Sequence, residues 1–165
     1  MPANRVSVTT QAEFQQALDS AATTPISCID ITNDVIQLTS PLVLPKTLNT
    51  PSKRLIINGN GATIKPANTL TTPISALITR QPVNQTEALN TMQSQSFHFN
   101  DIMFDGRGVA ATGIDLAATY ASSVVNCSFK SLQNGVYLRF GLMTRVINCL
   151  TNAISGSAFV ADMGE

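Results

Sequence analysis

The stretch "GIDLAATYASSVVNCSFKSLQN", residues 113–134, is followed directly by "GVYLRFGLMTRVINCLTNAISG", residues 135–156. When one line is placed above the other, glycine matches glycine, apolar residues match apolar residues, and the dipeptide "NC" matches "NC". A third line opens at Ser157 with "SAFVAD". The sequence therefore contains a repeat with a period of 22 residues, which the fold has to explain.

Length and charge limit what this repeat can be. The 165 residues suffice for one domain with a core. Ten basic and ten acidic residues give a formal net charge of zero, which leaves no basic surface for nucleic-acid phosphates. No apolar run approaches the length of a membrane span, and the opening "MPANRVSVTT" lacks the pattern of a signal peptide. We expect a protein made in the cytoplasm that binds no nucleic acid and inserts into no membrane.

One helix is indicated near the start, in "TQAEFQQALDSAA". Thr10 and Glu13 have the spacing of a capping box, in which each side chain bonds the backbone N–H of the other residue. Phe14 and Leu18 fall on one face of such a helix, together with two alanines. The sequence therefore predicts an amphipathic helix from Gln11 to about Ala21.

After this helix, the apolar residues form short clusters such as "CIDI", "VIQL", "RLIING", "SALIT", "FHF" and "GVYL", separated by Gly, Asn, Pro and Ser. These clusters predict short strands, and the pieces between them are too short for crossover helices. The Leu and Asn pattern of leucine-rich repeats is missing. A parallel β-helix with three short strands per coil fits the period. One coil would comprise strands at Gly113–Leu116, Ser123–Asn126 and Ser128–Lys130.

Stacking of coils explains why "NC" recurs. Residues one period apart lie above one another at the strand spacing of about 4.8 Å. Asn126 and Asn148 would then occupy the same sharp turn, where asparagine tolerates left-handed backbone angles and its amide bonds to the next asparagine. Cys127 and Cys149 would also stack, either as a disulfide or, in the interpretation we prefer, as buried free thiols.

These features resemble the right-handed parallel β-helix (pectin lyase-like) superfamily of pectate lyases, polygalacturonases and phage tailspikes. The resemblance rests on the asparagine turns, "NGVYL", "RLIINGNGATI" and the helix in front, and it covers residues 5–165. It implies an all-β, right-handed coil whose first turn is sealed by the helix. It also implies that Asn58 and Asn100 continue the asparagine ladder, with the register slipping by several residues at Asn100.

The same resemblance gives the domain organisation. Residues 1–165 form a single β-helix domain, with a strand and the capping helix in residues 5–22 and coils in residues 26–165. A looped excursion from the coils is expected at residues 65–96, where one strand candidate lies among polar residues.

The catalytic candidates by residue type are Asp101, Asp105 and Arg107, in "NDIMFDGRG". The enzymes of the superfamily use carboxylates to hold Ca²⁺ in lyases or as acid and base in hydrolases, and the lyases add an arginine. The repeated acidic set of the lyases and the paired-Asp and His-Gly motifs of the hydrolases are missing. The preferred alternative is that "FDGRG" is a turn in which Gly106 and Gly108 supply positive φ angles.

A binding surface is predicted on one outward face of the coils. If the apolar residues of "GIDL" point inward, Asp115 points outward, and the period places Tyr137 and then Phe159 beside it, with Arg139 nearby. Aromatic rings beside a carboxylate and a guanidinium suit carbohydrate binding. The alternative is that a loop or another subunit covers these aromatic residues.

Other sites find little support in the sequence. His98 is the only histidine, so neither a histidine metal site nor a Ser-His-Asp triad is expected. Three cysteines are too few and too scattered for a disulfide framework or a CxxC metal site. We therefore expect no metal and no cofactor, with Ca²⁺ considered only if the protein is a lyase.

The predicted function is a structural or receptor-binding part of a phage virion, such as a tail fibre or tailspike, that presents a carbohydrate- or partner-binding face. The alternative is a polysaccharide lyase or glycoside hydrolase of the pectate-lyase type, and the missing motifs favour the first. A scaffold in an adhesin or an injection machine has the same chemistry. Expected partners are other copies of the chain, other virion proteins and cell-surface polysaccharide, in a virion or outside the cell.

The last repeat contains nine residues, 157–165, of a period of 22. An open coil end exposes unpaired backbone groups over an apolar core. We therefore expect that the chain continues beyond residue 165, or that another subunit covers this end in a trimer or larger assembly.

Overall fold

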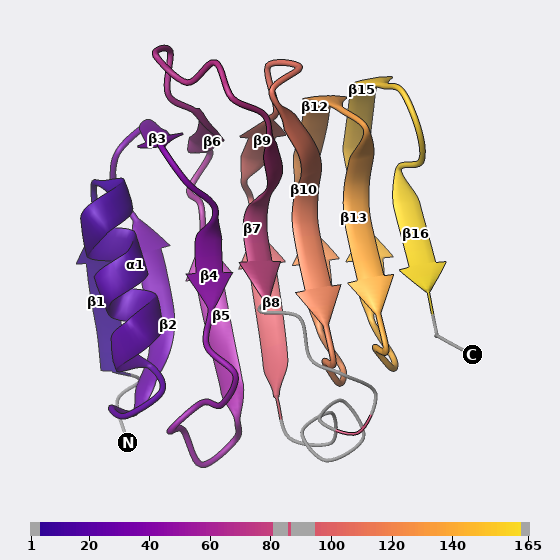
Figure 1. Ribbon diagram of the computed structural model, residues 1–165. Helices are drawn as coiled ribbons and strands as arrows, with labels where there is room; N and C mark the ends of the chain where they lie inside the picture. The colour runs from indigo at the N-terminus through magenta and orange to yellow at the C-terminus, as the bar shows by residue number, and fades with distance from the viewer. Residues whose placement is uncertain (1–3, 81–85, 87–94, 163–165) are drawn as a thin grey trace.

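The computed structural model describes residues 4–80, 86 and 95–162. The chain is an all-β parallel solenoid of about six turns, in which each full turn supplies one strand to each of three sheets (Figure 1). Sheet A has the order β1 (Asn4–Val8), β2 (Ile26–Ile31), β5 (Arg54–Asn58), β8 (Ser96–Asn100), β11 (Ser123–Val125) and β14 (Arg145–Ile147). Sheet B has β3 (Val35–Leu38), β6 (Thr63–Pro66), β9 (Met103–Asp105), β12 (Ser128–Leu132) and β15 (Leu150–Ile154). Sheet C has β4 (Leu42–Leu44), β7 (Ile74–Arg80), β10 (Ala110–Ala117), β13 (Asn134–Arg139) and β16 (Phe159–Asp162).

The prediction of a parallel solenoid with three short strands per coil is confirmed. All pairs among the described strands are parallel, and partners are one coil apart, as in the pairing of β10 with β13. Inward positions stack apolar residues into columns. Ile78, Ile114 and Val136 form one such column in sheet C, and each of them is fully buried. In sheet B, the rings of Phe104 and Phe129 stack with centroids 5.1 Å apart. Burial of these columns is the main favourable contribution to folding.

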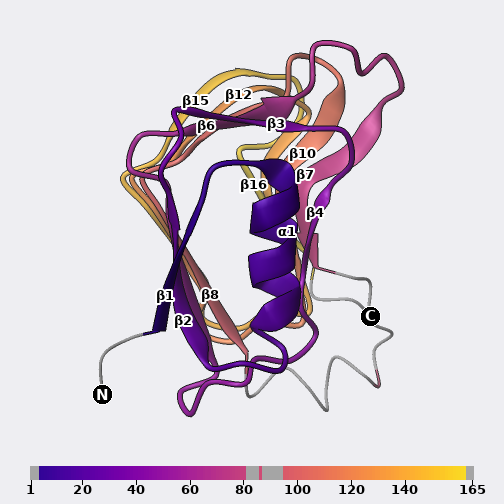
Figure 2. The ribbon, with the colours of Figure 1, turned by 90° about the vertical axis from the view of Figure 1, so that its left-hand side faces the viewer.

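Helix α1 (Gln11–Ser20) has the expected capping box, with Thr10 and Glu13 bonded reciprocally. Phe14 and Leu18 on its apolar face are fully buried in the same core as the strands. Figure 2 shows α1 within the outline of the three sheets, beside β4. The amide of Gln15 accepts a hydrogen bond from the Val43 backbone N–H at 2.8 Å and donates to the Val43 carbonyl at 3.0 Å. A glutamine side chain thus takes the place of a strand partner for β4.

The sharp corner after sheet A contains asparagines in the left-handed region. Asn126 and Asn148 have φ angles of 54° and 52°, and Asn148 Nδ2 donates to Asn126 Oδ1 at 2.7 Å. Asn100 pairs with Val125, one position before this corner, so the left-handed residue of that coil is Asp101, with φ 55°. The placement of Asn58 and Asn100 in the same column as Asn126 is therefore wrong. They lie at strand ends and form a second ladder.

Coil length varies, which is why the ladder positions shift. Bonded side chains of successive coils are 28 residues apart between Asp30 and Asn58, and 42 apart between Asn58 and Asn100. The repeat of 22 residues applies between Asn126 and Asn148. The long coil includes residues 65–96, where a looped excursion is expected from the sequence. Its strand candidate is β7, and residues 81–85 and 87–94 lie outside the described part of the chain.

A buried arginine connects several coils at the end of β7. The Arg80 side chain is fully buried and donates hydrogen bonds to the carbonyls of Ala117, Ala118 and Lys46. Its guanidinium also lies 5.5 Å from the centre of the Phe97 ring. Burial lowers the pKa of Arg80 to about 10, so the side chain stays charged at neutral pH. Carbonyl groups therefore solvate this charge inside the solenoid.

The cysteines carry free thiols. Cys28 and Cys127 are buried, and Cys149 is half-buried and packs against the core. Burial raises the pKa of Cys127 to about 12, which keeps this thiol protonated and unreactive. Among the described residues, no helix combines the length and the apolar character needed to cross a bilayer.

Candidate functional site

The outer face of sheet C carries a row of polar side chains. Register pairs Thr79 of β7 with Asp115 of β10, Asp115 with Tyr137 of β13, and Tyr137 with Val160 of β16. Because side chains alternate along a strand, the buried residues on either side of Asp115 direct its carboxylate outward. The row therefore places one carboxylate beside one aromatic ring, at the spacing of neighbouring strands.

An ion pair fixes the centre of this face. Arg139 Nη2 lies 2.8 Å from Asp115 Oδ2, and Arg139 Nε donates to Asp115 Oδ1 at 3.3 Å. The side chains are 31% and 19% exposed, so the pair is partly shielded from water. Burial raises the pKa of Asp115, and the charge of Arg139 opposes this shift. The arginine is held in one orientation and keeps N–H groups that Asp115 does not use.

The tyrosine of this face is also held in place. Tyr137 Oη donates to Asp162 Oδ2 at 3.0 Å, and this bond raises the pKa of the phenol. The guanidinium carbon of Arg139 lies 5.9 Å from the centre of the Tyr137 ring, within the range of a cation–π contact. Four charged or aromatic side chains therefore brace one another across three coils, since Asp115 lies on β10 and Asp162 on β16.

These side chains line a shallow groove of about 500 Å³. Hydroxyl and amide groups complete its lining: Ser75, Thr79, Thr112 and Asn134. Such a surface offers directional hydrogen bonds and one aromatic ring, which are the contacts that a sugar uses.

The placement of Phe159 on this row is wrong. Phe159 pairs with Val136, and Val160 takes the position beside Tyr137. The spacing here is 23 residues rather than 22, as the bond between Ser157 and Asn134 also shows. One extra residue exchanges the two faces of a strand, so Phe159 enters the inward column, and 41% of it remains exposed in the last described strand. The same shift brings Asp162 opposite Arg139, a site residue that the fixed period of 22 misses.

The three catalytic candidates flank β9, with Asp101 before this strand and Asp105 and Arg107 at its end. Asp101 occupies a left-handed corner. Asp105 accepts a hydrogen bond from the Arg107 backbone N–H and lies 3.9 Å from Lys130 Nζ. The Arg107 guanidinium donates to the carbonyls of Pro66 and Ala67 in the preceding coil. The side chains of Asp105 and Arg107 are therefore engaged in the turn after β9. In the described residues, no group of three or more Asp, Glu, His or Cys could hold a metal ion.

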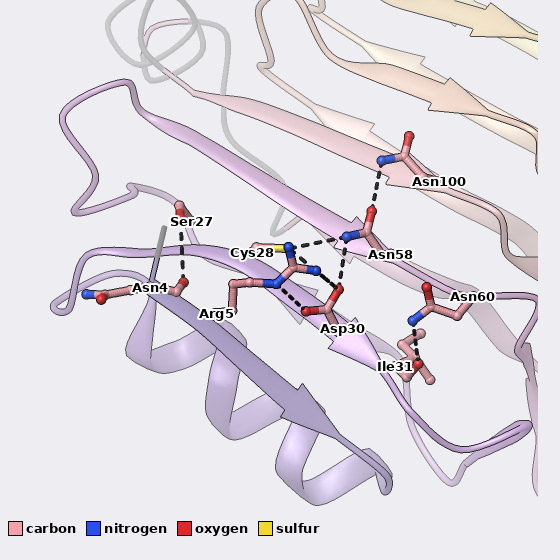
Figure 3. Close-up of polar contacts among 9 residues, drawn as sticks. All are labelled: Asn4, Arg5, Ser27, Cys28, Asp30, Ile31, Asn58, Asn60 and Asn100. Atoms are coloured by element: carbon pink, nitrogen blue, oxygen red, sulfur yellow. Dashed lines mark hydrogen bonds and ion pairs between the residues drawn. The ribbon is translucent and has the colours of Figure 1, made fainter. Parts of the chain in front are cut away.

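A second polar cluster lies on the outer face of sheet A (Figure 3). Arg5 donates two hydrogen bonds to the Asp30 carboxylate, at 2.7 and 2.8 Å, and lowers its pKa. Asn58 Nδ2 donates to Asp30 Oδ1 at 3.0 Å, and Asn100 Nδ2 donates to Asn58 Oδ1 at 3.1 Å. The chain of bonds crosses four coils. The sequence pointed only to Asn58 and Asn100, because the variable coil lengths hide the alignment with Arg5 and Asp30.

Comparison with known proteins adds one match. Residues 5–127 match the family described as a putative pectate lyase-like adhesive domain. Neither the curated proteins nor the solved structures gave a match.

Proposed function

The chain belongs to the family of putative pectate lyase-like adhesive domains, and on this premise we propose that it is an adhesive module that binds carbohydrate on the outer face of sheet C. The observation that supports this site most is the bracing of Arg139 by Asp115 and of Tyr137 by Asp162. Side chains that are already ordered lose little conformational entropy when a ligand binds.

Binding is favoured over catalysis by the state of the carboxylates. Asp115 is bonded to Arg139, and Asp162 to Tyr137, so each is committed to positioning a neighbour. A polysaccharide lyase or hydrolase of the pectate-lyase type needs a carboxylate or a base that is available to the sugar. This enzyme reading remains the alternative to an adhesive function.

We also propose the kind of particle in which this adhesive module acts. A fibre or tailspike of a phage virion, made in the cytoplasm and acting outside the cell, is one particle that presents such a module to cell-surface polysaccharide. Assembly with further copies or with other virion proteins is supported by exposed apolar side chains in the last described coil. Val146, Ile147 and Leu150 are 39%, 49% and 73% exposed. Light scattering at several protein concentrations tests for a trimer or larger assembly.

We also propose the finer features of the superfamily for this chain, namely right-handed winding and a role for α1 as the cap of the first coil. The cap is supported by the buried Phe14 and Leu18 and by the bonds from Gln15 to β4. An apolar core end that faces water would otherwise be destabilising.

A glycan array followed by calorimetry tests the adhesive function. The chain is expected to bind a subset of glycans, and Arg139→Ala and Tyr137→Ala should each weaken that binding about tenfold. Lys130→Ala on sheet B is the matched control, because it removes an exposed cation on another face and should leave affinity unchanged. Release of unsaturated or reducing ends from the bound glycan would instead indicate the enzyme. If no glycan binds, or if the three variants behave alike, the site on sheet C is wrong.

A further inference from the structure

The outer face of sheet A contains a second groove, of about 390 Å³. Strands β2 and β5 contribute most of its lining, with Arg54, Ile56 and Asn58 facing outward on β5. Arg5 of β1 and Asn100 of β8 complete it. Arg54 and Asn58 are separated by four residue steps, about 13 Å along the strand. The groove is therefore long and shallow, and it lies on a different sheet from Tyr137 and Arg139.

Amide groups along one side of this groove are fixed in orientation. Asn58 uses Oδ1 to accept from Asn100 and Nδ2 to donate to Asp30, so its oxygen and nitrogen are assigned by their partners. The last amide of the row, on Asn100, is oriented by the same bond. Its Oδ1 has no donor among the described residues and remains available as an acceptor.

The charges of the groove leave one cation without a partner. Asp30 is compensated by the bidentate bond from Arg5. The exposed guanidinium of Arg54 has no hydrogen bond or ion pair with any residue that the structure describes. Arg54 therefore gives this lining a net positive charge, in a chain whose overall formal charge is zero.

His98, which pairs with Ile56 on the neighbouring strand, is held neutral. Its two ring nitrogens lie 2.7 Å from Ser96 Oγ and 2.7 Å from Ser123 Oγ. Burial and the nearby charge of Arg54 lower the pKa of His98 to about 4. His98 thus adds no charge at neutral pH, and because both of its nitrogens are bonded, a ligand has to find its counter-charge in Arg54.

We propose that the groove over β2 and β5 binds an anionic sugar unit, with its carboxylate or sulfate on Arg54, its ring over Ile56 and a hydroxyl donating to Asn100. Guanidinium binds both anions through paired N–H groups. A half-buried isoleucine provides an apolar platform for the C–H face of a sugar. This site does not depend on the groove of sheet C, so the chain would carry two separate glycan sites.

Three oligosaccharides of equal length separate the possible ligands in a calorimetric titration. A hyaluronan tetrasaccharide carries carboxylates, a chondroitin sulfate tetrasaccharide adds sulfates, and chitotetraose with N-acetyl groups is neutral. We expect one or both anionic probes to bind, with an affinity that falls as salt rises, and the neutral probe to bind at least about tenfold more weakly.

Arginine variants assign the binding to the groove. Arg54→Ala should lower the affinity for the anionic probe about tenfold or more, because a charge-assisted bond is lost. Arg145→Ala removes an exposed arginine on the same face of sheet A and should leave the affinity unchanged. The proposal is overturned if no anionic probe binds, if the neutral probe binds as well and loses that binding in Arg54→Ala, or if Arg54→Ala has no larger effect than Arg145→Ala. Loss of binding in Arg139→Ala alone would mean that the anionic probe binds in the groove of sheet C and not on sheet A.

Discussion

Asn148 donates its side-chain N–H to the amide oxygen of Asn126 across one coil, at 2.7 Å. Both residues also have left-handed backbones, with φ angles of 52° and 54°. A residue at this corner therefore has to tolerate a positive φ angle and to carry an amide that can form a hydrogen bond with the next coil. Asparagine meets both, which explains why it recurs there.

Replacement of Asn148 by alanine should lower the free energy of unfolding by about 1–2 kcal/mol. The loss has two parts, the amide bond to Asn126 and the strain of a Cβ residue in the left-handed region. Asn148→Gly removes the amide but accepts the backbone angle, so it should cost less than Asn148→Ala. Urea unfolding of both variants measures the two parts. Equal stability of Asn148→Ala and the unchanged chain would contradict the ladder.

The hydrogen bonds from α1 to β4 give a second prediction. Gln15→Ala leaves both the N–H and the carbonyl of Val43 without a protein partner, and we expect it to cost about 1–3 kcal/mol. Gln16→Ala is the control, because that neighbour is exposed on the same helix and should change stability by a few tenths of a kcal/mol, about the size typical of surface sites. Thermal or urea unfolding compares them. A cost as small for Gln15→Ala as for Gln16→Ala would mean that water replaces the side chain there.

How far the sequence could predict this fold follows from the regularity of its coils. Between Asn126 and Asn148 the spacing is 22 residues, and the strand positions predicted there agree with β10, β11 and β12. The helix was predictable too, because the capping box and its apolar face are local signals. Local patterns and equal coils can be read directly from the chain.

Unequal coils hide the rest of the candidate sites. An interval of 42 residues separates Asn58 from Asn100, so no fixed period aligns the ladder of sheet A. A single added residue before Phe159 exchanged the inward and outward faces and concealed Asp162. Insertions in a solenoid are absorbed at its turns without disturbing the sheets, so they leave little trace in a short sequence.

Protonation of His98, the single histidine, makes the stability of the folded chain depend on pH. The pKa of His98 is about 4 in the folded chain, against an ordinary value of 6.5, so the unfolded chain binds the proton more strongly. Neutral His98 makes its full contribution to the stability of the folded chain above pH 6.5. This contribution is lost as the pH falls from 6.5 toward 4, because the unfolded chain takes up the proton first. Between pH 7 and pH 5 we expect a loss of stability of at most about 1–2 kcal/mol, because solvent screens part of the effect at this half-buried ring.

The variant His98→Gln tests this assignment. Glutamine can still bond to Ser96 and Ser123 but does not titrate, so the difference in stability between the two proteins should shrink or reverse at pH 5. The raised pKa of Asp115 contributes with the opposite sign in both proteins and cancels in the comparison. Urea unfolding at pH 7 and pH 5 provides the four values. An unchanged pH dependence in His98→Gln would show that another group is responsible.

The two glycines of the corner "FDGRG", Gly106 and Gly108, are required for different reasons. Positive φ angles occur at Arg107, 52°, and Gly108, 70°, and not at Gly106, where the sequence also suggested one. Gly106 is required for space, because a Cβ there would lie 2.4 Å from Leu132 Cδ2 and 2.5 Å from the Ser131 carbonyl oxygen in the next coil. A Cβ on Gly108 would meet nothing within 4 Å.

Gly106→Ala should therefore destabilise the chain by about 2–4 kcal/mol, because the methyl group forces two stacked coils apart. Gly108→Ala should cost about 1–2 kcal/mol, which is the strain of the left-handed backbone alone. Gly108→Asn should recover part of that cost, since asparagine tolerates the angle, whereas Gly106→Asn should be worse than Gly106→Ala because it is larger. Urea unfolding of the four variants gives the order. If Gly106→Ala were no more costly than Gly108→Ala, the coils would be able to separate at this corner, and close stacking would not explain the glycine.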